Sequence, residues 1–405
     1  MTPFCKKTEE QGFFPYALRT CTGSWGFLFE RVKDMDLDAQ YMAMAIELAK
    51  TAEGQTSPNP LVGAVIVKDG QVIGMGAHLR AGEPHAEVHA LRMAGERAAG
   101  ATLYVTLEPC SHHGKTPPCA DAVLAAGIRR VVIATLDPNP LVAGRGADKL
   151  RAGGVEVEIG VREQEAVRLN EVFFHFIQTK RPFVTVKTAS TLDGKIASAT
   201  GHSKWITGAA ARDEVHELRR KHDAILVGVG TVLADNPELT ARKEGKPYGR
   251  QPVRVILDSQ LRTPLSARVA QTDLAKTWIF TTSRTPEAKR EAFVEKGVTI
   301  IALDQPITVE AVLQELGERG ITSLLVEGGA EVNGSFLQAR AVQKVISYLS
   351  LKLIGGQQAP TPFGGRGFSV MDEAVMLTGT SIEQIDEHDL RIVGYPLWNE
   401  QVAQR

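Results

Sequence analysis

Three metal-binding side chains and one carboxylate stand in the first third of the chain. His85 lies two positions before Glu87, Cys110 follows a proline, and Cys119 comes nine positions after Cys110. Zinc binds imidazole and thiolate groups, and a catalytic zinc site leaves its fourth position open for water. Because two thiolates neutralise the charge of the ion, a nearby carboxylate must move the protons, and Glu87 would share the first helical turn with His85. The residues therefore predict a hydrolytic zinc site.

The order of these residues is similar to the H-x-E and P-C-x-x-C signature of zinc deaminases that act on bases. Here the eight residues 111–118 separate the two cysteines, where the signature has two. A closed structural zinc site, with His112 or His113 as a fourth protein ligand, is one alternative interpretation. Two unrelated buried cysteines are the other. The complete ordered set of His, Glu, Pro-Cys and Cys favours the hydrolytic site over both.

Strands that alternate with helices are expected to position this cluster. The expected helices are 36–50, 85–99, 120–126 and 163–178, and the expected strands are 61–67, 71–77, 102–107, 130–135 and 155–159. A Pro-Asn-Pro loop lies at 58–60, and Lys68-Asp69-Gly70 reads as a hairpin turn. This alternation predicts a layered α/β domain that closes near residue 180.

Arg181-Pro182 opens a second predicted α/β unit. Its expected strands are 183–187, 224–229, 253–257, 277–281, 298–302, 323–326 and 344–351, with helices at 210–221 and 308–319. Gly228-Val229-Gly230 lacks the third glycine of a dinucleotide-binding fingerprint, which argues against a Rossmann site. The strand that ends at Gly328-Gly329 is expected to run into a helix, whose N-terminus could hold a phosphate. A simple tight turn is the alternative there.

Longer motifs carry a resemblance from about residue 36 to the C-terminus. The chain resembles the bifunctional riboflavin-biosynthesis deaminase/reductase family at Asn59-Pro60, Val62-Gly63, His78, 85–87 and 106–119, and again at 186–197, 203–207, 228–237 and 326–329. The long loop between the two cysteines separates this family from the tRNA and nucleoside deaminases. The resemblance implies a cytidine-deaminase-like three-layer domain over 36–180 and a dihydrofolate-reductase-like α/β domain over 181–405.

The resemblance also implies a role for each site residue. In the first domain His85, Cys110 and Cys119 would bind zinc, Glu87 would be the catalytic proton shuttle, Asn59 and His78 would hold the pyrimidine, and His112, His113 and Lys115 would contact phosphate and ribose. In the second domain NADPH would contact Ala189, Trp205, Thr231, Asp235, Ser259, Gly329, Ala330, Glu331, Val332, Asn333, Gly334 and Ser335. The substrate would contact Ser203, Arg219, Leu239, Arg242 and Glu327. Lys187, near the end of a strand, is a further candidate to meet the ribose.

The implied reactions are consecutive. Zinc-dependent hydrolysis would deaminate 2,5-diamino-6-(5-phosphoribosylamino)pyrimidin-4-one, and NADPH would then reduce the ribosyl group to ribityl. Arg219 and Arg242 suit a phosphate because guanidinium binds it bidentately, and solvated surface arginines are the alternative. Two rival functions remain: another zinc base deaminase fused to a reductase-like domain, and a zinc-stabilised binding module without catalysis.

Composition limits the partners and the compartment. The 405 residues carry 46 Lys+Arg and 47 Asp+Glu, a net charge of -1 that argues against a protein held on nucleic acid by bulk positive charge. No run of about 20 apolar residues predicts a membrane span. Four cysteines are too few for a disulfide framework, which favours a reducing cytoplasm. We expect a homo-oligomer that forms through the reductase domain. Residues 1–35 read as an N-terminal extension ahead of a native start near Met35, or alternatively as a docking segment.

Overall fold

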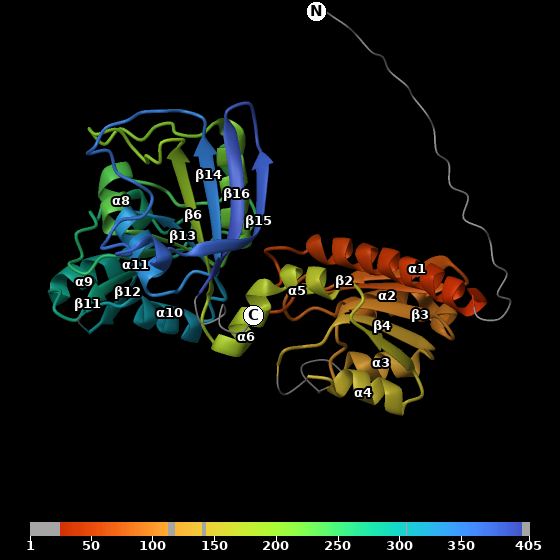
Figure 1. Cartoon of the computed structure of the whole chain (residues 1–405). Helices are drawn as coiled ribbons and strands as arrows, with labels where there is room; N and C mark the ends of the chain where they lie inside the picture. Colours follow the sequence, from red (N-terminus) through yellow and green to blue (C-terminus); the bar gives the residue numbers. More distant parts are fainter. Residues whose placement is uncertain (1–24, 112–117, 140–142, 305, 399–405) are drawn as a thin grey trace, which may run out of the picture.

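Two large sheets, one in each half of the chain, form the frame of the computed structural model (Figure 1). The structure describes residues 25–111, 118–139, 143–304 and 306–398. Helix α6 (Glu171–Thr179) leads from the first sheet to the second, and β6 (Phe183–Thr191) opens the second half. None of the helices in these ranges combines the length and apolar character that a membrane span requires.

The first sheet has the strand order β2-β1-β3-β4-β5. Its strands are β1 (Gly63–Lys68), β2 (Gln71–Ala77), β3 (Thr102–Leu107), β4 (Arg130–Thr135) and β5 (Glu156–Ile159). The β1–β2 hairpin closes through Asp69 and Gly70, with φ of 51° and 74°, as a turn with two left-handed residues requires. β1 pairs antiparallel with β2 and β3, whereas β3, β4 and β5 are parallel.

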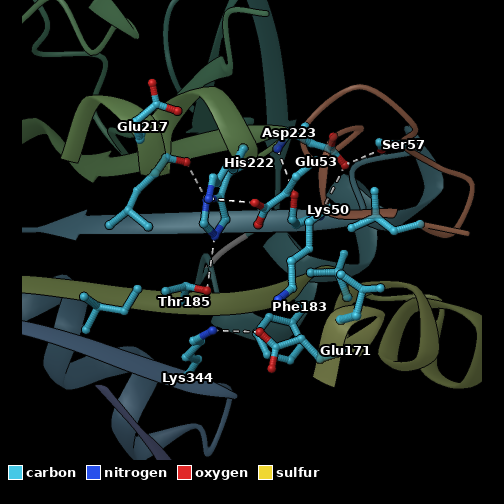
Figure 2. Close-up of a pocket in the computed structure, with 18 of the residues that line it drawn as sticks. Lys50, Glu53, Ser57, Glu171, Phe183, Thr185, Glu217, His222, Asp223 and Lys344 are labelled. Carbon is cyan, nitrogen blue, oxygen red and sulfur yellow. Dashed lines mark hydrogen bonds and ion pairs between the residues drawn. The ribbon is translucent and has the colours of Figure 1, made fainter. Parts of the chain in front are cut away.

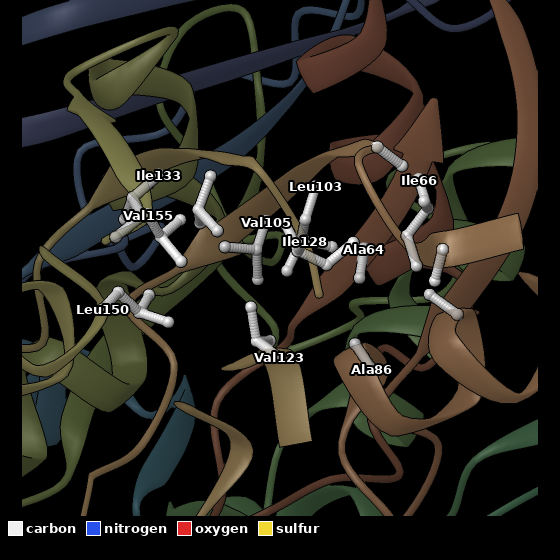
Figure 3. Close-up of a cluster of buried hydrophobic side chains, with 14 of the residues drawn as sticks. Ala64, Ile66, Ala86, Leu103, Val105, Val123, Ile128, Ile133, Leu150 and Val155 are labelled. Carbon is white, nitrogen blue, oxygen red and sulfur yellow. The ribbon is translucent and has the colours of Figure 1, made fainter. Parts of the chain in front are cut away.

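Strand alternation gives this sheet two buried faces and makes the domain three-layered. Ala64 and Ile66 of β1 belong to the core under α2 (Ala86–Ala94), α3 (Cys119–Ala125) and α4 (Arg145–Ala152), which Figure 3 shows. The intervening Val65 and Val67 pack on the opposite face with α1 (Trp25–Lys50) and α5 (Glu163–Leu169). Successive side chains of a strand point to opposite faces, so helices cover the sheet on both sides.

Three of the predicted helices differ from the structure by more than one residue, and α4 was not predicted. Helix α1 begins at Trp25, eleven residues before the expected start, because no proline or glycine pair interrupts 27–50. Helix α2 stops at Ala94, since Gly95 takes φ 56° and a short 3₁₀ turn follows. The single helix expected at 163–178 is two helices, α5 and α6, which are broken at Asn170.

The second sheet has the order β12-β11-β10-β7-β13-β6-β14-β16-β15. The first seven strands in that order are mutually parallel, and β16 is antiparallel to both neighbours. Beyond β6 the strands are β7 (Ala224–Gly228), β10 (Val253–Leu257), β11 (Thr277–Thr282), β12 (Thr299–Leu303), β13 (Ser323–Gly328), β14 (Lys344–Ser350), β15 (Met376–Gln384) and β16 (Asp389–Leu397). These seven parallel strands are the seven strands that the sequence predicted for this half of the chain. The β15–β16 hairpin was not predicted, because β15 is exposed along its whole length and has no buried apolar period.

Helices cover both faces of the parallel strands. Leu226 of β7 faces a core that includes Val312 of α10 (Val309–Glu318) and Phe336 of α11 (Ala330–Gln338). The adjacent residues of β7 face the other core, which α8 (Val229–Asp235) and α9 (Glu287–Val294) help to close. Helix α7 (Ala209–Lys221) packs on β14. The short strands β8 (Arg242–Lys243) and β9 (Lys246–Pro247) form a separate hairpin.

Candidate functional site

The three predicted metal ligands converge at one edge of the first sheet. His85 is the N-cap of α2, Cys110 follows the end of β3, and Cys119 is the first residue of α3. The His85 Nδ1 atom lies 3.1 Å from the Cys119 sulfur and 3.7 Å from the Cys110 sulfur. The three donor atoms all lie within 4.8 Å of one another. One imidazole and two thiols in this arrangement fit a zinc ion that keeps a free coordination position.

The two thiols have different proton affinities. A hydrogen bond from the Cys119 thiol lowers the pKa of Cys110 to about 4, and His85 and the backbone N–H of Cys119 add to this effect. The same pairing and burial raise the pKa of the Cys119 thiol. The pKa of His85 is raised, chiefly by its contact with Cys110. The Cys110 thiolate thus faces the His85 ring, and His85 and the Cys119 thiol release their protons when a metal ion binds.

Glu87 lies in the first turn of α2 and is 3% exposed. Burial raises the pKa of its carboxyl to about 7, against the opposing influence of its own backbone N–H and His85. Its Oε2 atom has no hydrogen-bond partner among the described residues. A carboxyl with this pKa can take up and release a proton near neutral pH.

Gly76 of β2 sets the position of that helical turn. A Cβ atom there would lie 2.3 Å from the carbonyl oxygen of Ala86. Only a residue without a side chain lets α2 approach the strand so closely, and the approach fixes Glu87 relative to the sheet.

The predicted pyrimidine contacts Asn59 and His78 lie side by side. His78 Nδ1 donates to the carbonyl of Pro84 at 3.2 Å, so its Nε2 accepts from the Asn59 amide at 3.1 Å. The His78 ring packs edge-on against the ring of His85, with centroids 5.2 Å apart. His78 is 1% exposed, and burial lowers its pKa. His78 is therefore a buried residue, although it directly follows the end of β2.

Glu108 organises the loop beside the metal-binding residues, a role that the sequence did not suggest. Its Oε1 accepts from the backbone N–H groups of Gly146 and Ala147 at 2.7 and 3.1 Å. Its Oε2 accepts from those of Gly144 and Asp137 at 2.9 and 3.3 Å. The carboxylate thereby also complements the positive end of α4. Its position two residues before Cys110 was the available signal. The predicted phosphate and ribose contacts His112, His113 and Lys115, and the alternative fourth ligand among them, lie outside the described residues.

The predicted NADPH contacts gather at the carboxyl edge of the second sheet. Ala189 lies on β6, Thr231 and Asp235 on α8 after β7, Ser259 after β10, and Gly329 to Ser335 at the start of α11 after β13. These four strands are parallel, so their carboxyl ends share one edge, where ligands bind in open α/β sheets. Thr231 Oγ1 lies 3.5 Å from the position that a Cβ on Gly329 would take. The starts of α8 and α11 therefore lie side by side (Figure 1).

Several of these predicted contacts have their side chains engaged elsewhere. The Asn333 amide donates to the carbonyl of Pro362 at 2.8 Å, and the Glu331 carboxylate accepts from the N–H of Gly365 at 3.2 Å. Backbone groups of the turn are thus what α11 can offer a phosphate. Trp205 is 65% exposed, and the Arg212 guanidinium lies 4.5 Å from its ring centroid.

Ser203 and Trp205 line a small cavity of about 280 Å³. The Ser203 hydroxyl donates to Asp235 at 3.4 Å, which joins a predicted substrate contact to a predicted cofactor contact.

Arg219 and Glu327 form a bidentate ion pair. The Nε and Nη2 atoms of Arg219 donate to the two carboxylate oxygens at 2.6 and 2.8 Å, and the side chains are 14% and 8% exposed. Although burial opposes ionisation, Arg219 and Lys187 hold the pKa of Glu327 at about 2. Burial lowers the pKa of Lys187, which lies 5.9 Å from the ring centroid of Tyr348. The alternative of a solvated surface arginine is wrong for Arg219.

The two remaining predicted substrate contacts differ from each other. Arg242 pairs with Glu238 at 2.9 Å and is 32% exposed, so it is accessible to a ligand. Leu239 is 3% exposed in the core beside Ile225 and Val227, and its φ is 53°. Leu239 can therefore offer a ligand only its backbone.

A cavity lies between the two halves of the chain (Figure 2), and its lining includes Asn59 from the first predicted site and Arg242 from the second. Its volume is about 1100 Å³, and its walls include Lys50, Ser57, Glu171, Thr185 and His222. Acidic and basic side chains line it in similar numbers, as in the Lys344–Glu171 pair at 2.8 Å. Nothing in this lining favours a phosphate over a cation.

His222 in the wall of this cavity is expected to make stability depend on pH. Its Nδ1 donates to the carbonyl of Leu218 at 2.7 Å, and its Nε2 lies 3.2 Å from Thr185 Oγ1. Burial lowers its pKa, with weaker opposing effects from Asp223, Glu53 and the Leu218 carbonyl. The unfolded chain, with a histidine pKa of about 6.5, then binds the proton first, so stability is present above pH 6.5 and is lost as the pH falls below it.

Urea unfolding at pH 7.5 and 5.5 measures this effect. We expect His222→Gln to remove up to about 1 kcal/mol of the acid-induced loss in unfolding free energy. An identical loss in the variant and the unchanged chain would show that His222 does not contribute.

Comparison with known proteins gives matches to both halves. The cytidine and deoxycytidylate deaminase zinc-binding region matches residues 35–135, and the RibD C-terminal domain matches residues 182–389. The riboflavin biosynthesis protein RibD of Bacillus amyloliquefaciens is 50% identical over 361 residues, which are 89% of this chain and 96% of that protein. The RibD of Escherichia coli K12 is 46% identical over 330 residues, 78% of this chain and 89% of that protein.

Two solved structures agree with the whole described architecture. Acinetobacter baumannii RibD superimposes with a TM-score of 0.81 at 42% identity, covering 90% of this chain and 100% of that one. The diaminohydroxyphosphoribosylaminopyrimidine deaminase/5-amino-6-(5-phosphoribosylamino)uracil reductase of Thermotoga maritima gives a TM-score of 0.80 at 42% identity, with the same coverage.

Proposed function

The chain belongs to the RibD family of bifunctional riboflavin biosynthesis enzymes, and from that premise we propose which of its residues perform each activity. It joins a cytidine-deaminase-like zinc domain to a RibD reductase domain that uses NADPH. The deaminase substrate is the diaminopyrimidinone ribotide, and the reductase substrate is its deaminated uracil counterpart. The two compounds are those that the name of the Thermotoga protein gives.

Deamination takes place at the cluster of His85, Cys110 and Cys119, which hold the zinc ion. Zinc supplies the Lewis acidity that activates water. The Glu87 carboxylate accepts one proton of the attacking water and passes it to the ring nitrogen. It then passes the second proton, from the hydroxyl group of the addition product, to the leaving amine, which departs as ammonia. Asn59 and His78 hold the pyrimidine beside Glu87. The observation that carries this assignment is geometric: three ligand atoms lie within 4.8 Å of one another, and the buried carboxyl of Glu87 lies in the helical turn that follows His85.

Reduction takes place at the carboxyl edge of the second sheet. NADPH, which supplies the hydride, is held by the backbone of residues 329–335 together with Thr231, Asp235, Ala189, Ser259 and Trp205. Ser203, the backbone of Leu239, and Arg242 bind the ribotide, and the accessible guanidinium of Arg242 is suited to its phosphate. The Arg219–Glu327 pair presents a charged carboxylate to the ribose next to Lys187. The supporting observation is that Arg219 fixes both oxygens of Glu327.

The domain boundary that we propose lies near residue 180, with the deaminase over 36–180 and the reductase over 181–405. In its support, Lys180 ends α6 with a left-handed φ of 57°, and β6 begins three residues later. Helix α1 begins at Trp25, so residues 25–35 continue the first helix of the deaminase domain. We place the enzyme in the cytoplasm, because the thiols of Cys110 and Cys119 must stay reduced to bind zinc.

NADPH absorbance tests the two activities together. The purified holoenzyme is mixed with NADPH and the diaminopyrimidinone ribotide, and ammonia is measured in parallel. We expect NADPH oxidation that depends on the ribotide and follows ammonia release. Ammonia release without oxidation would contradict the proposed reductase site, and the absence of both would contradict the whole assignment.

A homo-oligomer is proposed to form through β15, one of the two edge strands of the nine-stranded sheet. All nine residues of β15 are exposed, and Met376 and Ile382 are 68% and 67% exposed. An exposed edge strand with apolar side chains pairs readily with another strand, and a second copy of the same strand satisfies twofold symmetry.

Ile382→Lys should shift the molar mass from light scattering to that of a monomer. Val294→Lys, at a 57% exposed position on α9, should leave the mass unchanged. An Ile382→Lys protein that keeps its mass would exclude this edge.

A further inference from the structure

A short segment of the deaminase domain, residues 53–57, lies directly on the reductase domain. Arg220 Nη1 donates to the carbonyl of Glu53 at 3.0 Å, and Lys221 pairs with the Glu53 carboxylate at 2.7 Å. A Cβ on Gly54, where φ is 80°, would lie 3.0 Å from the carbonyl oxygen of Arg220. The segment therefore packs against the end of α7 without room for side-chain atoms at Gly54. Figure 2 shows Glu53 and Ser57 of this segment beside Asp223.

Ser57 ends the segment with a hydrogen bond to a fixed acceptor. Its hydroxyl donates to Asp223 Oδ2 at 2.9 Å. Asp223 is 1% exposed, and the same oxygen accepts from the N–H and hydroxyl of Thr322 at 2.8 and 2.6 Å. Its other oxygen lies 2.7 Å from Arg250 Nη1. Asp223 is thus held at the start of β7 by the reductase domain itself and cannot follow Ser57 if the loop moves.

The loop that Ser57 enters carries a residue of the deaminase site. Two positions further, the N–H of Asn59 donates to the carbonyl of Thr56 at 2.8 Å, and the Asn59 side chain meets His78. At the other end of the loop, the Asn170 side chain binds both backbone groups of Leu61, at 2.8 and 2.9 Å. Residues 56–61 are therefore anchored at three points, and one of these is in the other domain.

We propose that Ser57 and Asp223 form a positioning pair through which the reductase domain sets the place of Asn59 in the deaminase site. This inference rests on the proposed role of Asn59 as a pyrimidine contact. Glu87 and the zinc ligands are on α2, on α3 and after β3, and none of the described contacts to the reductase domain touches them. Loss of the pair therefore affects binding of the pyrimidine and leaves the proton-transfer step intact.

The test measures deamination kinetics on the zinc-loaded, full-length chain. For Ser57→Ala we expect KM for the diaminopyrimidinone ribotide to rise roughly three- to tenfold, since the lost hydrogen bond ends on a buried charge. The kcat for deamination, the zinc content and the reductase kinetics with deaminated ribotide should not change. Ser57→Thr retains the hydroxyl and should restore a near-native KM. Asp223 is unsuitable for substitution, because it also holds Thr322 inside the reductase domain.

Glu53→Gln is the matched control. It breaks the exposed Lys221 pair at the same interface but leaves Ser57 and Asp223 untouched. It should change KM by less than about twofold, as exposed ion pairs contribute little. An unchanged KM in Ser57→Ala, or an equal rise in both variants, would overturn the positioning pair. A loss of kcat together with zinc would do so too, by indicating a general disturbance of the domain. Failure of the deaminase assignment itself is distinct, because the unchanged enzyme would then release no ammonia.

Discussion

Glu87→Gln is expected to lower kcat for deamination by about 10²- to 10⁴-fold, the usual contribution of a general acid–base group. The amide has the shape of the carboxyl, so α2 and the three ligand atoms should keep their places. It cannot accept a proton, however, so water activation and protonation of the leaving amine both lose their carrier. Ammonia release measures the reaction, and metal analysis should find the same zinc content as in the unchanged chain.

The nearby Glu83→Gln serves as control for the loss of a carboxylate. Glu83 lies two residues before His85 and is exposed, so its substitution should leave kcat within about twofold. NADPH oxidation with already deaminated ribotide should be normal in both variants. Near-native ammonia release by Glu87→Gln would mean that another group carries the proton and that the buried carboxyl has a different task.

Arg219→Met is expected to damage the reductase domain in two ways. It leaves the Glu327 carboxylate buried without its bidentate partner, and breaking a buried ion pair from one side costs about 3–5 kcal/mol. The free energy of unfolding in urea should fall by that amount in the reductase transition. The rate of NADPH oxidation should fall at least about tenfold, since the carboxylate proposed to face the ribose loses its orientation. Ammonia release should continue.

The double variant Arg219→Met/Glu327→Met separates stability from function. Replacing both partners with apolar side chains removes the unpaired charge and should recover most of the lost unfolding free energy. It should not recover NADPH oxidation if the pair acts on the substrate. If the double variant recovers both the unfolding free energy and NADPH oxidation, the Arg219–Glu327 pair has only a structural role. If Arg219→Met oxidises NADPH at the unchanged rate, the pair does not belong to the proposed site.

The deaminase half was largely predictable because its signals are local. The bounds of β2, β3 and β4 agree with the sequence prediction, since each is a short, mainly apolar run that begins one to three residues after a glycine. His85, Cys110 and Cys119 come together as their positions at helix and strand ends imply. The signature order of residue types was sufficient for this site, and no long-range information was needed.

What the sequence did not predict depends on partners that are far apart along the chain. The break at Asn170 exists because its side chain binds Leu61, 109 residues away. Arg219 was assigned to a phosphate, but 108 residues further on Glu327 occupies its guanidinium. Residue type and spacing describe what a side chain can bind, but they do not show which of several suitable partners the fold brings to it.

The bond between Ser57 and Asp223 has a consequence for the order of events during synthesis. The two residues are 166 positions apart. A ribosome that adds about 5–20 residues per second needs roughly 8 to 33 seconds to cover that distance. Thr322, which holds Asp223 in place, emerges later still. The first domain can therefore fold around its sheet before the loop that carries Asn59 can form its hydrogen bond to Asp223. In a nascent chain the zinc ligands then come together well before the pyrimidine pocket is complete.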